Sequence, residues 1–582
     1  MATIQSKISR GHKYWYIVES RRVNGKPRPI VLAYLGKARD LLARLAGIRA
    51  PLVTKSFSHG AVAALLQVAG KLNVPELINK HLHSPRSYMP AKPLRHHLTV
   101  GITLVLGALG RVCTPTSKRG WWEWAKNTSC EYLLRCALGR IDSQHFWDLM
   151  DALPVHSIPT IERELLQQVR KHYALEEDSL LLDTTNFFTF IDTTNHKCTI
   201  ARRGNNKQKR NDLRQFGLAL VVTRKDLVPL FHLTYQGNTH DSRVFSQVIQ
   251  QIKERMMQLE LDMDKQTLIF DRGNNSKKNF ALIDELSLHY VGALTPYHHQ
   301  QLMEEAEGQY QSIRFQGKEQ AVYRVERMIW GKERTVLLFV SDRLRSGQLR
   351  GIHQLLGKKE KELQQVQRSL RSKRNKDEHR QALEKRIGQL VKGQHLEDLI
   401  VWRLVEQPDQ SLGLEYSIDS TRLRMLEEEV GFRILVTDRK EWNSAQIMQA
   451  FYDQSDVEQA FKNLKNPYHL ALRPQFHWTD QKIVVHNFIC VLGFLFSVLL
   501  WKQAKQAVQY LGTLDSLLDK LNSIRLATLI EQTSQPGRPK VVYQLEQLSP
   551  QEKELLDALE ITDLHLHPPQ IKGVGVYETD PA

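Results

Sequence analysis

The sequence predicts an α/β protein of several domains, built around a mixed five-stranded sheet with helices. Three observations predict this fold class. The chain has 582 residues, more than a single hydrophobic core usually holds. Residues 176–296 alternate short apolar runs with amphipathic segments, as layered α/β sheets do. Two of the apolar runs, in "SLLLDTTNFF" and "LIFDRGNNS", carry an aspartate where a buried strand should remain apolar.

The charge balance points to a polyanionic partner. The chain is 41% hydrophobic and 25% charged, as ordinary soluble proteins are, but its 81 Lys and Arg outnumber its 63 Asp and Glu. The formal net charge of +18 favours nucleic acid, although ribosome-associated and membrane-surface proteins show the same excess. The five cysteines are scattered, without a CxxC pair, which argues against a structural zinc site and against a disulfide framework.

The first 175 residues are expected to form two domains. Residues 1–37 are predicted to be a basic β-hairpin, because apolar and polar residues alternate on both sides of Asn24 and Gly25. Residues 38–175 show helical periodicity, as in "ARDLLARLAGI" and "IERELLQQVRKHY", and are predicted to form a helical domain that binds DNA ends. Within it, the Trp-rich stretch "SKRGWWEWAK" belongs either to that DNA-binding surface or to the helical core.

No segment is expected to span a membrane. The N-terminus lacks the apolar stretch of a signal peptide. The longest apolar run, "FICVLGFLFSVLLW" from Phe488 to Trp501, is too short for a comfortable span and is interpreted as a buried helix. Together with the sparse cysteines, these features indicate a cytoplasmic protein.

Residues 176–296 predict the element order βββαβαβ, in which three antiparallel strands precede two helix–strand crossovers. This is the order of the RNase H-like fold. Residues 297–431 interrupt it as an insertion of strands and a long charged helical segment, which is either a solvated antiparallel helical hairpin or an element that tracks DNA. The core is expected to resume over 432–510, and residues 511–582 to form a helical region and a tail.

Three acids are the candidate catalytic residues. In the predicted strand order the first and fourth strands are neighbours, so Asp183 and Asp271 should lie side by side at one edge of the sheet. Adjacent carboxylates repel each other unless a cation neutralises them, and Mg²⁺ prefers such hard oxygen ligands. Glu458 borders the apolar stripe of "VEQAFKNLK", from which a helix could present it to the same edge. Each acid alone is more simply a cap, turn or surface residue, whereas the set is specific.

These motifs resemble the DDE insertion-sequence transposases of the insertion-sequence-four-like superfamily, whose RNase H-like domain carries an insertion before the last acid. The resemblance covers about residues 180–500 and includes "DTTNFF", "PLFHLTYQGNTHDS", "IFDRGNNS" and "VEQAFKNLK" followed by "LRPQFHWTDQKIVVHNFIC". It implies that Asp183, Asp271 and Glu458 form the catalytic, metal-binding triad. It also implies that Mg²⁺, replaceable by Mn²⁺, is the cofactor.

The chain departs from the best-studied members of that superfamily near the last acid. Those members carry a Tyr seven residues and an Arg four residues before the Glu, and a Lys seven residues after it. This chain has Phe451 and Gln454 at the first two positions, with Tyr452 beside the first, and keeps Lys465. The phosphate and base contacts known around this helix, and a hairpin-ended intermediate, therefore do not carry over directly.

The residues expected to contact DNA lie in three places. Lys465 is placed to meet a phosphate, two helical turns after Glu458. Trp330 of the insertion either stacks on an extruded base or belongs to the core. The loop "ARRGNNKQKRNDLR" supplies candidate contacts to the DNA backbone, namely Arg202, Arg203, Lys207, Lys209, Arg210 and Arg214.

The resulting hypothesis is a DNA transposase, an endonuclease that cleaves the ends of its own insertion sequence and joins the 3′-OH ends to target DNA by two-metal-ion phosphoryl transfer. Its partners would be the double-stranded terminal inverted repeats and target DNA. A second protomer is also expected, since one active site cannot process two ends. The expected location is the nucleoid in the cytoplasm of a prokaryote. Two alternatives are a metal-dependent nuclease of the same fold without strand transfer, and a catalytically silent DNA-binding relative.

Overall fold

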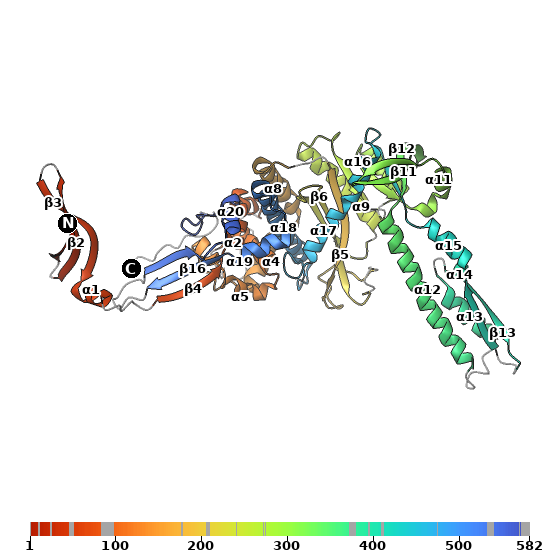
Figure 1. The fold of residues 1–582 in the computed structure, drawn as a ribbon, viewed down its shortest axis with the longest axis horizontal. Helices are drawn as coiled ribbons and strands as arrows, with labels where there is room; N and C mark the ends of the chain where they lie inside the picture. Colours follow the sequence, from red (N-terminus) through yellow and green to blue (C-terminus); the bar gives the residue numbers. More distant parts are fainter. Residues whose placement is uncertain are drawn as a thin grey trace. The chain divides into compact units, whose positions relative to one another are not determined.

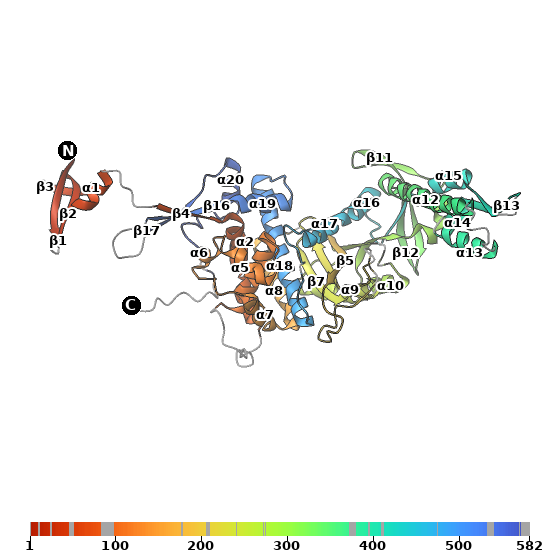
Figure 2. The ribbon, with the colours of Figure 1, turned by 90° about the horizontal axis from the view of Figure 1, so that it is seen from below.

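The computed structural model of the chain divides into two compact units. The helical unit comprises Met1–Ile161, Leu464–Gln475 and Val485–Ala582, and the sheet unit comprises Glu162–Asn463 and Phe476–Val484. Figures 1 and 2 show the elements of both. The structure describes residues 2–9, 12–23, 26–45, 52–82, 98–175, 179–204, 206, 210–239, 241–271, 273, 275–371, 380–393, 396–408, 412–473, 475–531, 540–569 and 571.

The N-terminal residues form a three-stranded antiparallel sheet of β1 (Ala2–Ser9), β2 (His12–Val23) and β3 (Lys26–Lys37). β2 and β3 pair along their length, down to Val23 opposite Lys26, as the predicted hairpin requires. Its turn residues lie outside the described part. The sequence predicts only this hairpin, and β1 adds a third strand by pairing with the other edge of β2.

Helices make up most of the rest of the helical unit. Every residue of α4 (Val100–Cys113) is buried, and the indole of Trp121 donates from Nε1 to the carbonyl of Leu106 at 2.9 Å. Trp121 is 2% exposed, so this part of the Trp-rich stretch belongs to the core. The other helices are α1 (Ala38–Leu45), α2 (Gly60–Lys71), α3 (Val74–Lys80), η1 (Lys118–Gly120), α5 (Trp121–Ala125), α6 (Cys130–Leu134), α7 (Ser143–Asp151), η2 (Val155–Ser157), α19 (Leu514–Ser523), α20 (Pro550–Ala558) and most of α18 (Asp480–Val508), which begins in the sheet unit.

The long apolar helix α18 is a core helix by burial. Among the described residues it is long and apolar enough to cross a membrane, and up to three segments qualify if two bent helix pairs are each counted as one span. However, 94% of its apolar window is buried inside the protein, as predicted for the run from Phe488 to Trp501. All five cysteines are buried, and none of them forms a disulfide.

A second small sheet joins segments that are far apart in the sequence. β4 (Leu52–Ser58) pairs antiparallel with β16 (Arg525–Glu531), which pairs with β17 (Lys540–Leu545). The sequence analysis predicts helical regions where these three strands lie, and it does not predict the strands. Each is only six or seven residues long, and although β16 and β17 are neighbours in the sequence, the pairing of β16 with β4 depends on a partner more than 450 residues away.

The sheet unit is a mixed α/β structure around one nine-stranded sheet of order β10-β11-β12-β15-β9-β8-β5-β6-β7. α9 (Asp241–Gln258) follows β7, and α10 (Lys277–Glu285) follows β8, as the predicted crossovers require. The strands are β5 (Ser179–Thr189), β6 (Arg214–Thr223), β7 (Pro229–Gln236), β8 (Thr267–Phe270), β9 (His289–Leu294), β10 (Gln311–Phe315), β11 (Lys318–Ile329), β12 (Lys332–Val340) and β15 (Phe432–Thr437).

The predicted number of five strands is wrong for this sheet. β15, the first element after the insertion, pairs antiparallel with β9 on one side and with β12 on the other. The strands β10, β11 and β12 therefore continue the sheet instead of forming a separate layer. Strand pairing satisfies the backbone groups that a sheet ending at β9 would leave open, which is why the inserted strands add to this edge.

The charged segment of the insertion folds around a small core of its own. α12 (Asp342–Arg371) and α13 (Arg380–Val391) pack with the hairpin of β13 (Ile400–Glu406) and β14 (Leu412–Ile418). The interpretation as a solvated helical hairpin is thus incomplete, because one face of α12 is buried and a β-hairpin completes the arm. The remaining helices of the sheet unit are α8 (Ile158–His172), η4 (Pro296–His298), α11 (Gln300–Glu305), α14 (Leu396–Leu399), α15 (Ser420–Glu429), α16 (Ser444–Tyr452) and α17 (Gln454–Lys465).

The helical core buries two cations beside each other. Arg111 is 2% exposed and donates through Nη1 to the carbonyl of Thr116 at 2.6 Å, while its Nε and Nη2 have no partner among the described residues. The Lys118 ammonium is also buried without a hydrogen-bond partner there and lies 5.2 Å from the ring centroid of Phe146. Burial, reinforced by the charge of Arg111, lowers the pKa of Lys118 to about 7.

Replacing Lys118 with Met should stabilise the helical unit at pH 7 by about 1–3 kcal/mol, because the variant no longer buries an unpaired polar group. In the wild type the folded state has the lower pKa for Lys118. The unfolded state therefore binds more protons between about pH 7 and the ordinary lysine value of 10.5, and stability should rise with pH across that window. Lys118→Met should remove this rise. Urea unfolding followed by tryptophan fluorescence at pH 7 and pH 9 measures both effects.

The matched control is Lys126→Met, which removes an exposed lysine that pairs with Glu123 on the same stretch of chain. It should leave the stability and its pH dependence nearly unchanged. The same pH dependence in both variants would refute the assignment to Lys118.

Candidate active site

Two aspartates follow adjacent parallel strands at matching positions. β5 and β8 pair in parallel from Ser179 opposite Thr267 to Leu182 opposite Phe270. The next residues on the two strands are Asp183 and Asp271. Since neighbouring strands lie about 4.8 Å apart, this register places the two carboxylate-bearing residues side by side, and the predicted adjacency of the first and fourth strands is confirmed.

The strand lengths explain why a carboxylate is tolerated at this point of the sheet. β8 ends at Phe270, whereas β5 continues to Thr189 paired only with β6 on its other side. Asp183 is therefore the first residue of β5 past the end of its parallel neighbour, and it is half-buried, while Asp271 is exposed. Water reaches both carboxylates, so neither carries the full cost of a charge in a closed core.

The third predicted acid lies on α17 but is not gathered with the other two. Val457 and Phe461 bury the apolar stripe of the helix as expected, and Glu458 is exposed beside it. Within the described part of the chain, no group of three or more His, Cys, Asp or Glu side chains is close enough to hold a metal ion. The structure thus brings Asp183 and Asp271 together by strand register and leaves Glu458 outside that pair.

The helix before Glu458 shows what occupies the positions that depart from the family pattern. Phe451 is a core residue, 7% exposed, with the guanidinium of Arg433 5.3 Å from its ring centroid. Tyr452 packs against Phe315 at 5.5 Å, and its hydroxyl lies 3.5 Å from the Oγ of Ser341. Both aromatic side chains therefore serve packing between α16 and the sheet.

The basic loop uses part of its charge to hold its own shape. Arg214 donates through Nη1 and Nη2 to the carbonyls of Asn195 and Thr193, at 3.1 and 2.8 Å. Arg202 donates through Nε to the carbonyl of Thr199 at 2.9 Å. These two predicted DNA contacts are thus engaged with the backbone of the 193–199 turn.

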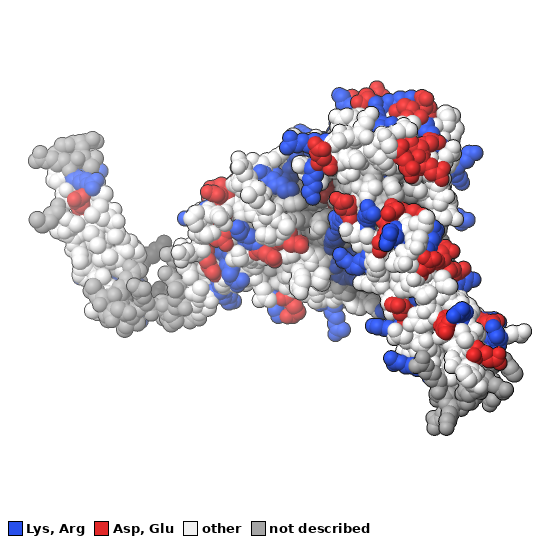
Figure 3. Space-filling view, turned by 45° about the vertical axis from the view of Figure 1, so that its right-hand side comes forward, with Lys and Arg blue, Asp and Glu red and all other residues white. Residues whose placement is uncertain are grey.

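The other predicted DNA-contact residues divide into several cases. Arg210 pairs with Asp212 at 2.8 Å, Arg203 is exposed, and Lys207 and Lys209 lie outside the described residues. Lys465 is exposed at the end of α17. Trp330 is half-buried in the turn between β11 and β12, and its ring meets Phe280 edge to face at 4.6 Å. On the face shown in Figure 3, acidic and basic side chains are interspersed, so charge alone outlines no single patch there.

The structure reveals an anchor that the sequence does not predict. The carboxylate of Asp480, the first residue of α18, accepts from the backbone N–H groups of Thr199 and Ile200 at 2.8 and 2.9 Å, and from the hydroxyl of Thr199 at 2.5 Å. Burial raises the pKa of Asp480, but these donors outweigh it, and the net pKa lies below the usual 3.8. In sequence, an acid at a helix start indicates only a capping residue, so no local signal distinguishes this role.

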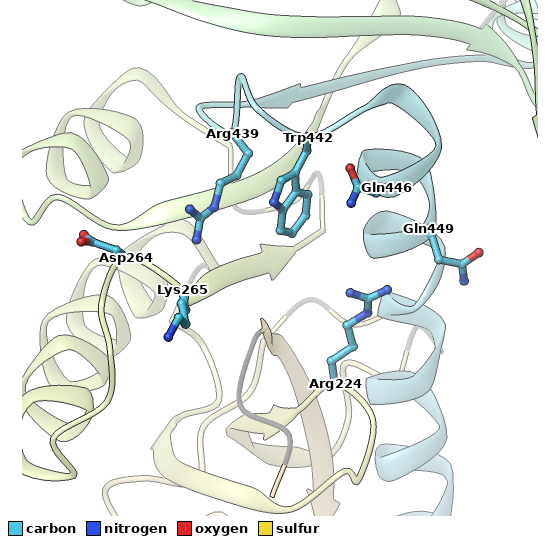
Figure 4. Close-up of a pocket in the computed structure, with 7 residues that line it drawn as sticks. All are labelled: Arg224, Asp264, Lys265, Arg439, Trp442, Gln446 and Gln449. Carbon is cyan, nitrogen blue, oxygen red and sulfur yellow. The ribbon is translucent and has the colours of Figure 1, made fainter.

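A pocket lies away from the two aspartates. It measures about 440 Å³ and is lined by Arg224, Asp264, Lys265, Arg439, Trp442, Gln446 and Gln449 (Figure 4). These residues surround the start of β8 and the end of β6, whereas Asp183 and Asp271 follow the opposite end of the β5–β8 pairing. Arg224 is paired with Asp453, and Arg439 donates to the hydroxyl of Thr267 at 3.0 Å. Both arginines of the pocket are thus bonded to other residues of the protein, and none of the candidate catalytic acids lines the pocket.

Comparison with known families decides the identity of this segment. Residues 188–474 match the family model described as the transposase DDE domain. The chain belongs to the DDE transposase family. The matched range contains Asp271 and Glu458 of this DDE transposase, and Asp183 lies five residues before it on the same strand as its first residues.

Other comparisons add little to the family match. A solved structure described as the piggyBac transposase synaptic complex with hairpin DNA is similar to the DDE transposase at 8% identity and a TM-score of 0.36, over 79% of each chain. A similarity this weak carries no argument about mechanism. No curated protein matches the chain.

The anchor at Asp480 gives a testable expectation for the turn that it holds. Asp480→Asn should raise amide hydrogen exchange at Thr199 and Ile200 by about tenfold or more, because hydrogen bonds to a charged acceptor contribute about 1.5–3 kcal/mol each. Exchange measured by mass spectrometry on peptides spanning residues 190–204 reports the change.

Asp192→Asn is the matched control. Its carboxylate accepts from the backbone N–H and hydroxyl of Thr194 within the same turn and does not reach the segment of Asp480. Faster exchange should then be confined to the start of the turn. Unchanged protection of Thr199 and Ile200 in Asp480→Asn would show that the anchor does not hold the turn.

Proposed function

We propose that this DDE transposase cleaves the ends of its own insertion sequence and joins the freed 3′-OH ends to target DNA by metal-dependent phosphoryl transfer. The observation that carries the proposal is the parallel register of β5 and β8, which sets Asp183 and Asp271 side by side. The family match supports action on DNA. The excess of basic residues supports a polyanionic substrate.

An RNase H-like core is part of the proposal. The strands β7, β6, β5, β8 and β9 are neighbours in that order, with β5–β6 and β6–β7 antiparallel and β5–β8 and β8–β9 parallel. This is the arrangement expected from the element order βββαβαβ. The inserted strands extend the sheet beyond β9 and leave these neighbours intact.

The two aspartates fit part of a magnesium site. Mg²⁺ is commonly held by one or two carboxylates, with water and substrate phosphate oxygens completing the shell, and Asp183 with Asp271 supplies such a pair. When bound, such a metal ion lowers the pKa of coordinated water and neutralises charge on the phosphate. In the proposal Glu458 joins the pair when DNA is bound, since α17 displays it on an exposed face. Asp183 and Asp271 orient the reacting phosphate, and the basic residues hold the DNA backbone.

Substitution of the acids separates chemistry from binding. Asp183→Ala, Asp271→Ala and Glu458→Ala should each lower the rate of cleavage by more than about 100-fold. Mutating a residue that only hydrogen-bonds to a metal ligand already lowers metal affinity or activity by about 10–100-fold, and loss of a ligand itself should cost more. Affinity for DNA should change little, since the basic residues supply it. Cleavage of a labelled duplex carrying the terminal sequence, with Mg²⁺ or Mn²⁺, and a gel-shift titration measure the two quantities.

Asp264→Ala is the control for general effects of removing a carboxylate. Asp264 is exposed and lines the pocket at the other end of the β5–β8 pairing. This variant should retain cleavage. Full activity of Asp271→Ala would exclude the proposed site, and cleavage without joining to target DNA would favour a nuclease.

The basic loop should contribute to affinity on every DNA sequence alike. Reversing the charge of Lys207, Lys209 and Arg210 should weaken binding uniformly. Each lost phosphate contact should lower the slope of log K against log salt by about one. Titrations at several salt concentrations, on terminal and unrelated duplexes, measure this slope. A loss confined to the terminal sequence would mean that the loop reads bases instead.

Two protomers should act together on a pair of ends, in the proposed setting of a prokaryotic nucleoid. One chain offers one set of acids, while two DNA ends must be cut and joined at one target. We expect at least a dimer on paired-end DNA, measured by light scattering. Mixing Asp183→Ala with the loop variant should restore cleavage if each protomer binds one end and cuts the other. A complex that holds both ends with one protomer would contradict this assembly.

A further inference from the structure

An exposed aromatic pair lies in the short segment that returns to the sheet unit. Phe476 is 60% exposed and Trp478 is 51% exposed, while His477 between them is 5% exposed. Alternation of this kind is typical of extended backbone and places the two rings on one face. Neighbouring large apolar side chains that are exposed to solvent often mark a binding surface, so we expect this face to bind a ligand or partner.

The aromatic pair is held in place by the turn that carries the loop arginines. Asn195 donates through Nδ2 to the carbonyl of Trp478 at 3.2 Å. Asp480, two residues after Trp478, fixes Thr199 and Ile200 through its carboxylate. These hydrogen bonds fix the backbone of the segment that carries the rings, as a preorganised binding surface requires.

Cations accompany the rings on the same support. The ammonium of Lys197 lies 5.7 Å from the ring centroid of Trp478, and Lys197 is exposed. Arg203, after the same turn, is exposed as well. We call Phe476, Trp478 and Lys197 the aromatic platform. Its combination of flat apolar rings with positive charge matches a chain of bases linked by phosphates.

Strand β5 links the platform to the acids. Arg214, which braces the turn, pairs with Thr189 at the end of β5, and Phe190 directly after that strand is 70% exposed. Asp183 lies six residues before Thr189, a separation of roughly 20 Å along an extended strand. Such a distance spans several nucleotides, so one DNA end could reach both places.

We propose that the aromatic platform binds unpaired nucleotides of DNA, a role that rests on the proposed action of this protein on DNA ends. Bases stack on aromatic rings with little dependence on sequence, and each such contact changes affinity by about 5- to 160-fold. Duplex DNA hides its base faces in the stack and exposes only phosphates, sugars and base edges, on which an aromatic ring cannot stack. The platform therefore discriminates single strands from duplexes, and Lys197 adds a backbone contact.

Anisotropy titrations with a fluorescein-labelled 15-nucleotide oligo(dT) and with a 15-base-pair duplex test the proposal. Trp478→Ala should weaken oligo(dT) binding about tenfold and change duplex binding less than twofold. Trp478→Phe should retain most of the affinity, because it keeps a ring. The bond from Asn195 goes to the backbone carbonyl of Trp478, so neither substitution removes it.

Two further variants keep the test independent of local damage. Lys197→Gln should lower the salt slope of oligo(dT) binding by about one without removing a ring. Tyr297→Ala removes an aromatic side chain of the sheet unit that is 76% exposed and outside the platform, and it should bind both probes as the wild type does.

The outcomes separate this inference from the proposed function. Equal affinity of Trp478→Ala and wild type for oligo(dT), or an equal loss on both probes, would overturn the platform while leaving DNA cleavage untouched. A wild type that binds neither probe and cleaves no terminal duplex would overturn the proposed function itself.

Discussion

The parallel pairing of β5 with β8 is the constraint on which the candidate site depends. Two carboxylates side by side repel each other, and a sheet interior would add the cost of desolvation. The structure avoids the second cost by ending β8 one residue before Asp271, so that Asp183 lies past the end of its neighbour. A shift of one residue in this register would turn one of the two side chains to the other face of the sheet. The pairing therefore decides whether the acids can act together.

The inserted strands stabilise a helix next to that pairing, from the edge of the sheet beyond β9. Arg334 of β12, 1% exposed, donates to both carboxylate oxygens of Asp284 on α10, at 3.1 and 2.6 Å. Its guanidinium also lies 5.1 Å from the ring centroid of Phe280 on the same helix. α10 begins six residues after Asp271, so the insertion fixes the helix that leads away from the second aspartate. A buried ion pair of this kind is costly to break, because the remaining partner would be left uncompensated.

Sequence patterns predicted the parts of the fold that local periodicity determines. The strands from β5 to β9, the helices α9 and α10, and the positions of Asp183 and Asp271 all follow from apolar runs and their order. The pairing of β4 with β16, the added strand β1 and the continuation of the sheet through β15 depend on partners distant in sequence. Glu458 shows the same limit at the site, because periodicity assigns it to a helix face and cannot set the distance of that face from the aspartates.

The basic loop shows why net charge overstates the surface offered to DNA. Arg202 and Arg214 point their guanidinium groups at backbone carbonyls of the 193–199 turn, and Arg210 is neutralised by Asp212. The contacts of Arg202 and Arg214 hold the shape of the turn. Asn195 and Asp480 bond this turn to the segment of Trp478, whose aromatic side chains carry no charge. A composition count assigns all these arginines to phosphate binding. In the structure some of them instead fix the turn beside the aromatic platform, the surface that we propose binds bases by stacking, and Lys197 and Arg203 are exposed there.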